Sequence, residues 1–495
     1  MSTFFIQQFG CRATQADGAA IERQLLDRGC TLAPDPSAAS IVILNTCTVT
    51  AAADAQARDA IRKIRAQNPA VQLIVTGCYA QRAPEELAAL PGVSHVVGNS
   101  HKPQIPNLVT QIASAALHQS AEKQNIIPGK AIEGSQPFVK NWQLPQASVA
   151  ANPPLAPILS ADIFAHPEFL SAPIHGGESH HTRPILKIQD GCSNRCSFCV
   201  IPFVRGKSRS LPPGAVLREI QSLGASGSRE IVLSGINLGT YGRDLTLRVE
   251  FIDLLRRILD ETTVERLRIS SIEPQDVTQD LIDLFAASDR IAQHFHMPLQ
   301  SASDRILAAM HRWYRSEHYA RRLDLIHDRL PHAAIGADVI AGFPGETESD
   351  HAATLSFIDR HPFTYLHVFS YSVRPGTKAA SLPDHVPAAT IKRRARELRS
   401  LSESKSAAFR RSRLNHTLRV LTLHRDERSI SEHSGIEYTP ALSSNYLRVQ
   451  IPGIFPANLW QDVAIASEEG NYIVGEPAAI DCELSVNSVL SAASV

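Results

Sequence analysis

The stretch DGCSNRCSFCVIPFVRG (residues 190–206) follows an apolar segment of strand length and holds three cysteines within eight positions: Cys192, Cys196 and Cys199. Cysteines at this spacing can gather three thiolates around one inorganic centre. Structural zinc takes four protein ligands, and two further candidates, His294 and His296, are about a hundred residues away. Two interpretations stay open here. One is an iron cluster with one iron free for another ligand, and the other is a zinc knuckle completed by a histidine.

Composition limits the class of protein. The chain has 495 residues, of which 43% are hydrophobic, and this is more than one core usually organises, so we expect two to four domains. Eight cysteines over this length do not form the dense framework of a secreted scaffold. The net charge of zero gives no overall sign of a polyanion partner. Because neither a secretion signal nor a run of about 18 apolar residues occurs, we expect a cytoplasmic protein without a membrane partner.

A second set of cysteines lies in the N-terminal part. Three strand-like segments there each end in a cysteine, and helix-like runs separate them: FFIQQFGC, IVILNTC and VQLIVTGC. Such alternation is typical of an α/β unit with a parallel sheet. Ligands bind at the carboxyl edge of these sheets, so Cys11, Cys47 and Cys78 are expected to converge. We therefore predict a second three-thiol site, in an N-terminal domain of residues 1–112.

The remaining chain divides by its pattern. Residues 113–181 are rich in Pro, Ala, Ser and Gln without clear periodicity, which predicts a linker or insertion. Residues 182–410 repeat strand-like and helix-like segments, which favours an open or closed parallel β/α barrel with its active site at the strand ends. Residues 411–485 contain short alternating segments typical of a small all-β barrel, and residues 486–495 are expected to form a frayed tail.

Seven further motifs, taken with the stretch around Phe198, give the chain a specific family resemblance. They are FGCRATQ, NTCTVT, TGCYAQ, SGINLGTYGRD, SSIEP, HFHMPLQSASDRIL and DVIAGFPGETESD. Together they resemble the radical S-adenosylmethionine methylthiotransferases over nearly the whole chain except the linker. Within that family, the chain is most similar to the bacterial enzymes that act on threonylcarbamoyladenosine in tRNA.

The resemblance implies both the fold and the cofactors. The fold would be an α/β multidomain one, with an N-terminal cluster-binding domain, a central radical S-adenosylmethionine partial (β/α) barrel and a C-terminal TRAM-like barrel. The cysteines of the first stretch would ligate a [4Fe-4S] cluster whose open iron binds S-adenosylmethionine. By the same resemblance, Cys11, Cys47 and Cys78 would hold a second, auxiliary [4Fe-4S] cluster that carries or supplies sulfur.

The implied reaction adds a methylthio group to C2 of N6-threonylcarbamoyladenosine at position 37, next to the tRNA anticodon. Reductive cleavage of S-adenosylmethionine would give a 5′-deoxyadenosyl radical that removes the C2 hydrogen, and a second S-adenosylmethionine would methylate the sulfur. An aromatic C–H has no acidic proton, so no side chain is assigned as a catalytic acid or base. The implied partners are the tRNA anticodon stem-loop and a low-potential electron donor such as flavodoxin or ferredoxin.

Further residues near expected strand ends are candidates for contact with S-adenosylmethionine: Phe198, Gly235, Ser271, Glu273 and Gln300. Ordinary roles in turns are the alternative for these residues and for the neighbouring Ser301. His294 and His296 alternate along one strand and would share a face. We expect them to pack in the core or line a pocket rather than to act in catalysis.

A basic run leads into the C-terminal barrel and is a candidate for contact with tRNA phosphates: Lys392, Arg393, Arg394, Arg410, Arg411 and Arg413. A solvated helix face is the alternative, since this is the usual role of charge runs. The C-terminal segment is similar to the TRAM domain of the family, although TLRVLTLHRDERSI departs from the expected pattern.

Other functions compete with the leading one. Relatives in the same family act on isopentenyladenosine in tRNA or on an aspartate of a ribosomal protein. A metal-binding RNA module without catalysis is a rival from another class. Iron content and release of 5′-deoxyadenosine would separate the enzyme from such a module.

Overall fold

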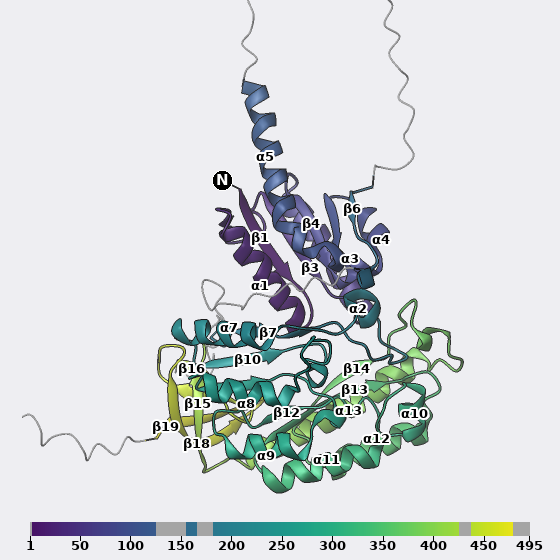
Figure 1. The fold of residues 1–495 in the computed structure, drawn as a ribbon. Coiled ribbons are helices and arrows are strands. Elements are labelled where there is room, and N and C mark those ends of the chain that lie inside the picture. Colours follow the sequence, from purple (N-terminus) through teal and green to yellow (C-terminus); the bar gives the residue numbers. More distant parts are fainter. Residues whose placement is uncertain (1, 125–154, 166–181, 425–436, 479–495) are drawn as a thin grey trace, which may run out of the picture.

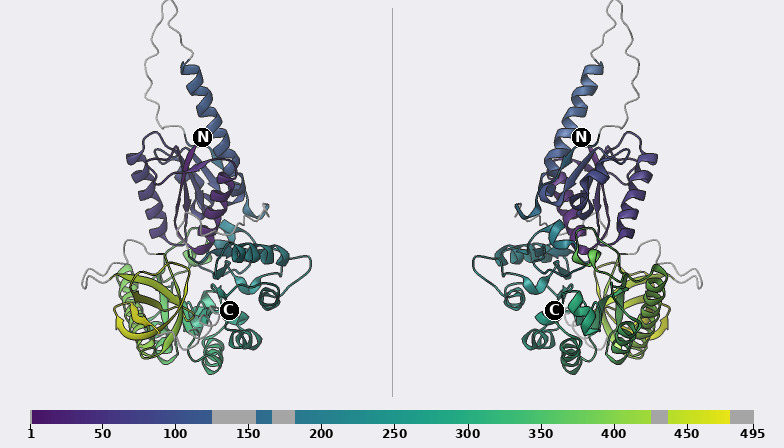
Figure 2. Two further views of the ribbon diagram at one scale, coloured as in Figure 1. Left: turned by 90° about the vertical axis from the view of Figure 1, so that its left-hand side faces the viewer. Right: turned by 90° about the vertical axis from the view of Figure 1, so that its right-hand side faces the viewer.

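The computed structural model describes residues 2–124, 155–165, 182–424 and 437–478. They form three units in chain order: an N-terminal α/β unit, a central β/α unit and a C-terminal β-barrel (Figure 1). The N-terminal unit sits on top of the central unit, and the barrel packs at its side (Figures 1 and 2). The expected fold class is confirmed for all three units. In the described ranges, no helix combines the length and apolar character needed to cross a bilayer.

The N-terminal unit is built on a parallel sheet in the order β2-β1-β3-β4-β5-β6. The strands are β1 (Thr3–Gln8), β2 (Thr31–Leu32), β3 (Ile41–Thr46), β4 (Gln72–Gly77), β5 (His95–Gly98) and β6 (Ile158–Leu159). β3 reads IVILNT and is buried along its whole length, as expected for a central strand covered on both faces. One face of the sheet is covered by α1 (Arg12–Leu26) and α5 (Ile105–Gln124). The other face is covered by α2 (Ala51–Gln67), α3 (Cys78–Arg82) and α4 (Pro84–Ala88).

The segment expected as a linker contributes to this unit at two places. Helix α5 continues past residue 112, and β6 pairs with Val96 and Val97 at the sheet edge. A two-residue strand shows no periodicity, so the sequence pattern carries no sign of it. Residues 125–154 and 166–181 lie outside the described residues, as does the expected tail, 486–495.

The central unit is a partial barrel of six parallel strands. Its sheets are β11-β10-β7 and β12-β13-β14, and single parallel bridges between residues 267 and 291 and between 271 and 296 join them. The strands are β7 (Ile185–Lys187), β10 (Glu230–Ser234), β11 (Arg266–Ile269), β12 (His294–His296), β13 (Ala334–Ala341) and β14 (Tyr365–Ser370). The helices on its outer side are α7 (Pro213–Ala225), α8 (Phe251–Glu261), α9 (Gln279–Ala287), α10 (Asp304–Ala309), α11 (Ser316–Arg329), α12 (Glu348–Arg360) and α13 (Ala388–Arg411).

Two short strands and a short helix extend from the first strand of this barrel. They are β8 (Gln189–Asp190), β9 (Arg209–Ser210) and α6 (Ile201–Arg205), with β8 and β9 paired antiparallel. The cysteine-rich loop lies between β8 and α6, so the barrel holds it at one end of its strands.

The C-terminal unit is a closed barrel in the order β15-β16-β17-β19-β18. Its strands are β15 (Thr417–Thr422), β16 (Tyr438–Ser443), β17 (Arg448–Pro452), β18 (Trp460–Glu469) and β19 (Tyr472–Pro477). Alternate side chains fill the small interior, among them Val449, Ile451 and Val463. The turn between β16 and β17 points toward the central unit and is fastened to β11, because Arg268 donates to the carbonyl oxygen of Ser443 (2.9 Å).

Candidate functional site

The loop that follows β8 folds back on itself and carries Cys192, Cys196 and Cys199. It begins at Gly191, where φ is +71° and an added Cβ would lie 2.1 Å from the carbonyl oxygen of Lys207. Only glycine fits such a backbone at this distance. The Cys199 N–H donates to the carbonyl oxygen of Cys196 (3.2 Å). Local backbone geometry therefore holds these three cysteines close together.

The electrostatics of this loop favour a bound cation. Burial, with a smaller contribution from the nearby Cys196, raises the pKa of Cys192 to about 11 and that of Cys199 to about 12. Three thiolates can therefore form together only when positive charge is bound among them. Arg312 supplies part of this charge, since its guanidinium donates to Sγ of Cys196 (3.2 Å) and pairs with the carboxylate of Glu273.

The second set of cysteines stands at the carboxyl ends of β1, β3 and β4, which are neighbours in the sheet. Gly10, with φ +107°, permits this approach, because an added Cβ would lie 2.6 Å from Cβ of Cys47 and 3.0 Å from its Sγ. Burial raises the pKa of Cys47 to about 12, and the proximity of Cys78 and Cys11 contributes. The predicted convergence of the three strand ends is thus present in the fold.

Neither set of thiols has the compactness of a single zinc site. Tetrahedral zinc with Zn–S bonds of about 2.3 Å brings sulfur atoms to roughly 3.8 Å from one another. Across the described residues, the one trio of potential ligands whose atoms all lie within 4.8 Å is His296, Asp338 and His367. Three more widely spaced thiols at each site suit a cluster of several irons better than one zinc ion.

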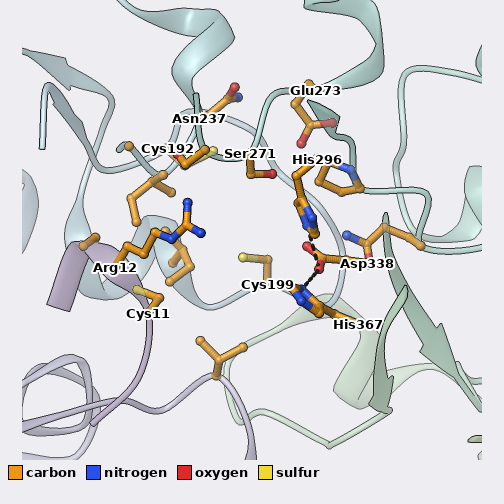
Figure 3. A pocket seen from close by; sticks show the side chains of 18 of the residues that line it. Cys11, Arg12, Cys192, Cys199, Asn237, Ser271, Glu273, His296, Asp338 and His367 are labelled. Carbon is orange, nitrogen blue, oxygen red and sulfur yellow. Dashed lines mark hydrogen bonds and ion pairs between the residues drawn. The ribbon is translucent and has the colours of Figure 1, made fainter. Parts of the chain in front are cut away.

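One cavity of about 490 Å³ lies between the two sets of cysteines. The three cysteines of the loop line it together with Cys11 and Arg12, and Cys11 and Arg12 face His296, Asp338 and His367 across it (Figure 3). Its walls come from all three units, because Tyr446 of the C-terminal barrel also contributes. A molecule in this cavity would contact both cysteine sites at once.

The predicted cofactor contacts all line this cavity: Phe198, Gly235, Ser271, Glu273 and Gln300. Their assignment to S-adenosylmethionine stays a prediction. Ser301 has a different surrounding, since its hydroxyl is buried and shares a hydrogen bond with Thr354 (3.3 Å). Asn237 was not expected, although it lies within the SGINLGTYGRD motif. Its buried amide has no nitrogen or oxygen partner among the described residues, and it hydrogen-bonds the thiol of Cys192.

A connected row of polar rings forms another wall of the cavity. The Tyr365 hydroxyl lies 2.7 Å from Nε2 of His294 and 3.0 Å from Nδ1 of His296. His296 and His367 in turn contact the carboxylate of Asp338 at 3.0 Å and 3.3 Å (Figure 3). The expected lining role of the two histidines is confirmed. Tyr365, Asp338 and His367 were not predicted, although Asp338 is the first residue of the DVIAGFPGETESD motif.

A buried cluster of charges joins the N-terminal unit to the central unit. Asp17 of α1 pairs with Lys102 (2.8 Å), with Arg205 (3.0 Å) and with Lys187. Asp190 pairs with the last two of these cations, at 2.8 Å and 3.0 Å. Burial opposes the ionisation of Asp17, but the three cations outweigh it and hold the pKa of this carboxyl well below its usual range. This cluster fixes how the two cysteine sites face each other.

The basic residues at the end of the central unit do not form one solvent-exposed patch of unpaired charges. Arg394 is buried and pairs with Glu346 (2.8 Å) and Glu348 (2.7 Å), so the interpretation of Arg394 as a phosphate contact is wrong. Separating this buried guanidinium from its two carboxylate partners would cost free energy, so the Arg394 side chain stays buried. Arg393 also pairs with Glu348 (2.6 Å).

The other members of the run differ in exposure. Arg410 and Arg411 both pair with Glu468, at 2.9 Å and 3.3 Å, and Arg413 is largely buried over the ring of Phe409. Lys392 is exposed on α13. Its contact with tRNA stays a prediction.

Two family models match the chain. Uncharacterized protein family UPF0004 matches residues 3–98, and the Radical SAM superfamily matches residues 186–358. The first match contains the three strand-end cysteines, and the second contains the three cysteines of the loop. The two sites therefore belong to two separately defined units.

Curated relatives match over most of the chain. Threonylcarbamoyladenosine tRNA methylthiotransferase MtaB of Bacillus subtilis is 34% identical, over 92% of this chain and 91% of the relative. The tRNA-2-methylthio-N(6)-dimethylallyladenosine synthase of Paenarthrobacter aurescens is 32% identical, over 87% and 76%. Among solved structures, the radical S-adenosylmethionine methyltransferase TsrM of Kitasatospora setae has a TM-score of 0.49 and 16% identity, over 76% of this chain and 74% of that one. The relatives' names give different nucleosides, and their identities to this chain are nearly equal.

Proposed function

This chain belongs to the radical S-adenosylmethionine methylthiotransferases that modify tRNA, and we propose that its substrate is N6-threonylcarbamoyladenosine at position 37, beside the anticodon. The family uses S-adenosylmethionine and [4Fe-4S] clusters, so the enzyme class and the cofactors follow from membership. The choice between the threonylcarbamoyl and the isopentenyl substituent does not follow from it. That choice rests on the chemistry of the cavity.

Arg12 is the observation that carries the proposal. Its side chain lies in the cavity next to Cys11, and within the described residues it forms no ion pair with a carboxylate (Figure 3). A half-buried guanidinium without an anion suits a ligand that brings one. The threonylcarbamoyl group ends in a carboxylate, whereas an isopentenyl group would leave the cation desolvated and unpaired.

The far wall of the cavity supports the same substrate. Asp338 and His367 offer hydrogen-bond acceptors across the cavity from Arg12. A threonylcarbamoyl group carries urea N–H and hydroxyl donors that could use them. A site for an isopentenyl group would be expected to present apolar side chains instead.

We assign the two clusters to the two sets of cysteines. Cys192, Cys196 and Cys199 would hold the cluster that binds S-adenosylmethionine, and the three strand-end cysteines would hold the auxiliary cluster: Cys11, Cys47 and Cys78. When bound, these groups supply the one-electron cleavage and the sulfur transfer that side chains cannot perform. Each protein ligand set leaves a position free for a further ligand.

The chain's own residues bind, orient and shield. Asn237, Ser271 and Glu273 line the cavity near Cys192 and would contact S-adenosylmethionine in this proposal (Figure 3). Arg312 places its positive charge against Cys196. The buried charge cluster holds the N-terminal unit over the mouth of the barrel, which keeps the target carbon between the two sites and away from water.

The test uses two tRNAs that differ only in the group on N6 of adenosine 37. Reconstituted enzyme with S-adenosylmethionine and a low-potential reductant is incubated with each, and the nucleosides are analysed by mass spectrometry. The proposal requires that the threonylcarbamoyl tRNA be methylthiolated at least about tenfold faster than the isopentenyl tRNA. An equal or reversed preference would reject it.

Variants of Arg12 connect this preference to the structure. Arg12→Gln removes the charge and is expected to reduce the preference, whereas Arg12→Lys keeps a cation and should retain part of it. Cleavage of S-adenosylmethionine without tRNA serves as the control and should be similar in all three proteins. A preference that survives in Arg12→Gln would assign the selection to other residues.

A further inference from the structure

The C-terminal barrel reaches the substrate cavity through one turn, formed by residues 443–447 between β16 and β17. We propose that Tyr446 in this turn is a positioning residue that aims Arg12 at the carboxylate of the substrate. The inference rests on the proposed function. It gives the barrel a part in choosing the nucleoside, in addition to any contact with the tRNA backbone.

The backbone of the turn is unusual at Tyr446. Its φ is +66°, in the left-handed region that bulky residues rarely occupy. Ser443 holds this shape, because its carbonyl oxygen accepts from the Tyr446 N–H (3.2 Å) and its hydroxyl accepts from the Leu447 N–H (2.9 Å). These hydrogen bonds hold Tyr446 in a conformation that costs backbone strain, and this conformation sets the direction of its side chain.

The central unit fixes the turn in place. Arg268 of β11 donates to the carbonyl oxygens of Ser443 (2.9 Å) and Ser444 (3.0 Å), and Arg266 donates to that of Leu442 (3.0 Å). Both arginines pair with Glu230, whose side chain is 0% exposed. The turn is therefore attached to the barrel strand next to the cavity and cannot shift independently of it.

The side chain of Tyr446 meets the other two units inside the cavity. Its ring stacks on His294, with centroids 4.3 Å apart and planes 12° from parallel, and the Arg268 guanidinium lies 5.3 Å from the ring centroid. Its hydroxyl accepts a hydrogen bond from Nη2 of Arg12 (3.4 Å). Tyr446 thus connects the N-terminal cation to the wall of rings in the central unit.

This contact has a specific consequence for substrate binding. An arginine side chain loses considerable rotamer freedom when it binds an anion, and a partner that holds it beforehand lowers this cost. Among the described residues, the Tyr446 hydroxyl provides the one hydrogen bond recorded for the Arg12 guanidinium. Loss of the hydroxyl should therefore weaken binding of a substrate with a carboxylate and leave a substrate without one unaffected.

The experiment measures binding of two anticodon stem-loops to the reconstituted enzyme by fluorescence anisotropy. One carries N6-threonylcarbamoyladenosine at position 37 and the other carries unmodified adenosine. We expect Tyr446→Phe to weaken binding of the first by about three- to tenfold, the effect of losing one ordinary hydrogen bond, and binding of the second by less than about twofold. Tyr472→Phe is the matched control, because among the described residues the one hydrogen bond of its hydroxyl is donated to Glu469 of the same barrel (3.3 Å), and it should change neither.

A double-mutant cycle separates positioning from simple packing. If Tyr446 acts through Arg12, then Tyr446→Phe should have no further effect in an Arg12→Gln background. Additive losses, or equal weakening of both stem-loops by Tyr446→Phe, would overturn the inference. The phenylalanine variant keeps the ring and should retain the thermal midpoint of the wild type, so the test does not depend on a larger truncation.

Failure of the inference can be told from failure of the proposed function. If the wild type binds the two stem-loops equally, the proposed nucleoside is wrong. If it prefers the threonylcarbamoyl stem-loop in an Arg12-dependent way and Tyr446→Phe keeps that preference, only the role of Tyr446 is wrong.

Discussion

The two sets of cysteines reach the same cavity by different means. Cys192, Cys196 and Cys199 lie on one loop whose backbone bonds and initial glycine bring them together locally. The second set comes from three strand ends that lie tens of residues apart in sequence. The three cysteines of the loop are brought together by local backbone structure alone. The second set comes together only when the sheet register is correct and the two units are docked correctly. The difference predicts which substitutions should damage one site and spare the other.

The largest expected effects come from the cysteines themselves. Cys196→Ala should abolish cleavage of S-adenosylmethionine, because it removes a proposed ligand of the site that binds it. Cys47→Ala should retain cleavage but form no methylthiolated nucleoside. Chromatography of 5′-deoxyadenosine and mass spectrometry of tRNA nucleosides measure the two outcomes separately. Methylthiolated product from purified Cys47→Ala protein would remove the second site from the mechanism.

Arg205 tests whether docking of the two units matters more to the second site than to the first. Arg205→Met leaves the buried carboxylates of Asp17 and Asp190 with fewer partners, so we expect a loss of about 3–5 kcal/mol in the free energy of unfolding. Denaturant titration measures this loss. Arg62→Met is the control, since Arg62 pairs with Asp59 at the exposed surface and should change stability by less than about 1 kcal/mol.

The activity of the Arg205 variant extends the comparison. Methylthiolation should fall by more than uncoupled cleavage of S-adenosylmethionine, because only methylthiolation needs both sites aligned. Equal losses in the two activities would show that docking supports the loop as much as the sheet edge.

Acid should weaken the same contact between the units. The folded-state pKa of Asp17 lies well below the unfolded value of about 3.9, so its contribution to stability is fully present above that value. The contribution is lost as the pH falls through the folded pKa. We expect Asp17→Asn to reduce the pH dependence of the unfolding free energy below about pH 4 by at least about 2 kcal/mol. Parallel curves for wild type and variant would mean that the carboxyl is not held ionised.

The smallest expected effect lies on the exposed surface of α13. Lys392 is exposed, and Lys392→Ala should reduce the slope of log affinity for tRNA against log salt by about one, with little change in stability. Arg394→Met should instead lower stability, because Arg394 is buried between carboxylates. Measurements of tRNA affinity at several salt concentrations, together with thermal unfolding, distinguish a phosphate contact from an internal ion pair.

Local patterns were sufficient for most of the fold and for both sets of cysteines. The spacing from Cys192 to Cys199 is visible in eight residues, and alternating apolar segments identified the strands on which the other three cysteines end. The rule that parallel strands share one carboxyl edge then predicted that Cys11, Cys47 and Cys78 lie together. These inferences succeed because they depend on periodicity and chain direction, which the sequence itself contains.

Tertiary structure alone decided what surrounds the cysteines. Tyr446 and Arg12 are separated by more than four hundred residues, and no local pattern relates them, yet their side chains meet in one cavity. The burial of Arg394 could not be predicted from the sequence either, because a basic run on a helix has the same composition whether its arginines face water or Glu346. Which partner a charge meets depends on packing between distant elements. The sequence by itself determined the cysteine sites and the order of the units, while their docking determined the walls of the cavity and the charges that face a substrate.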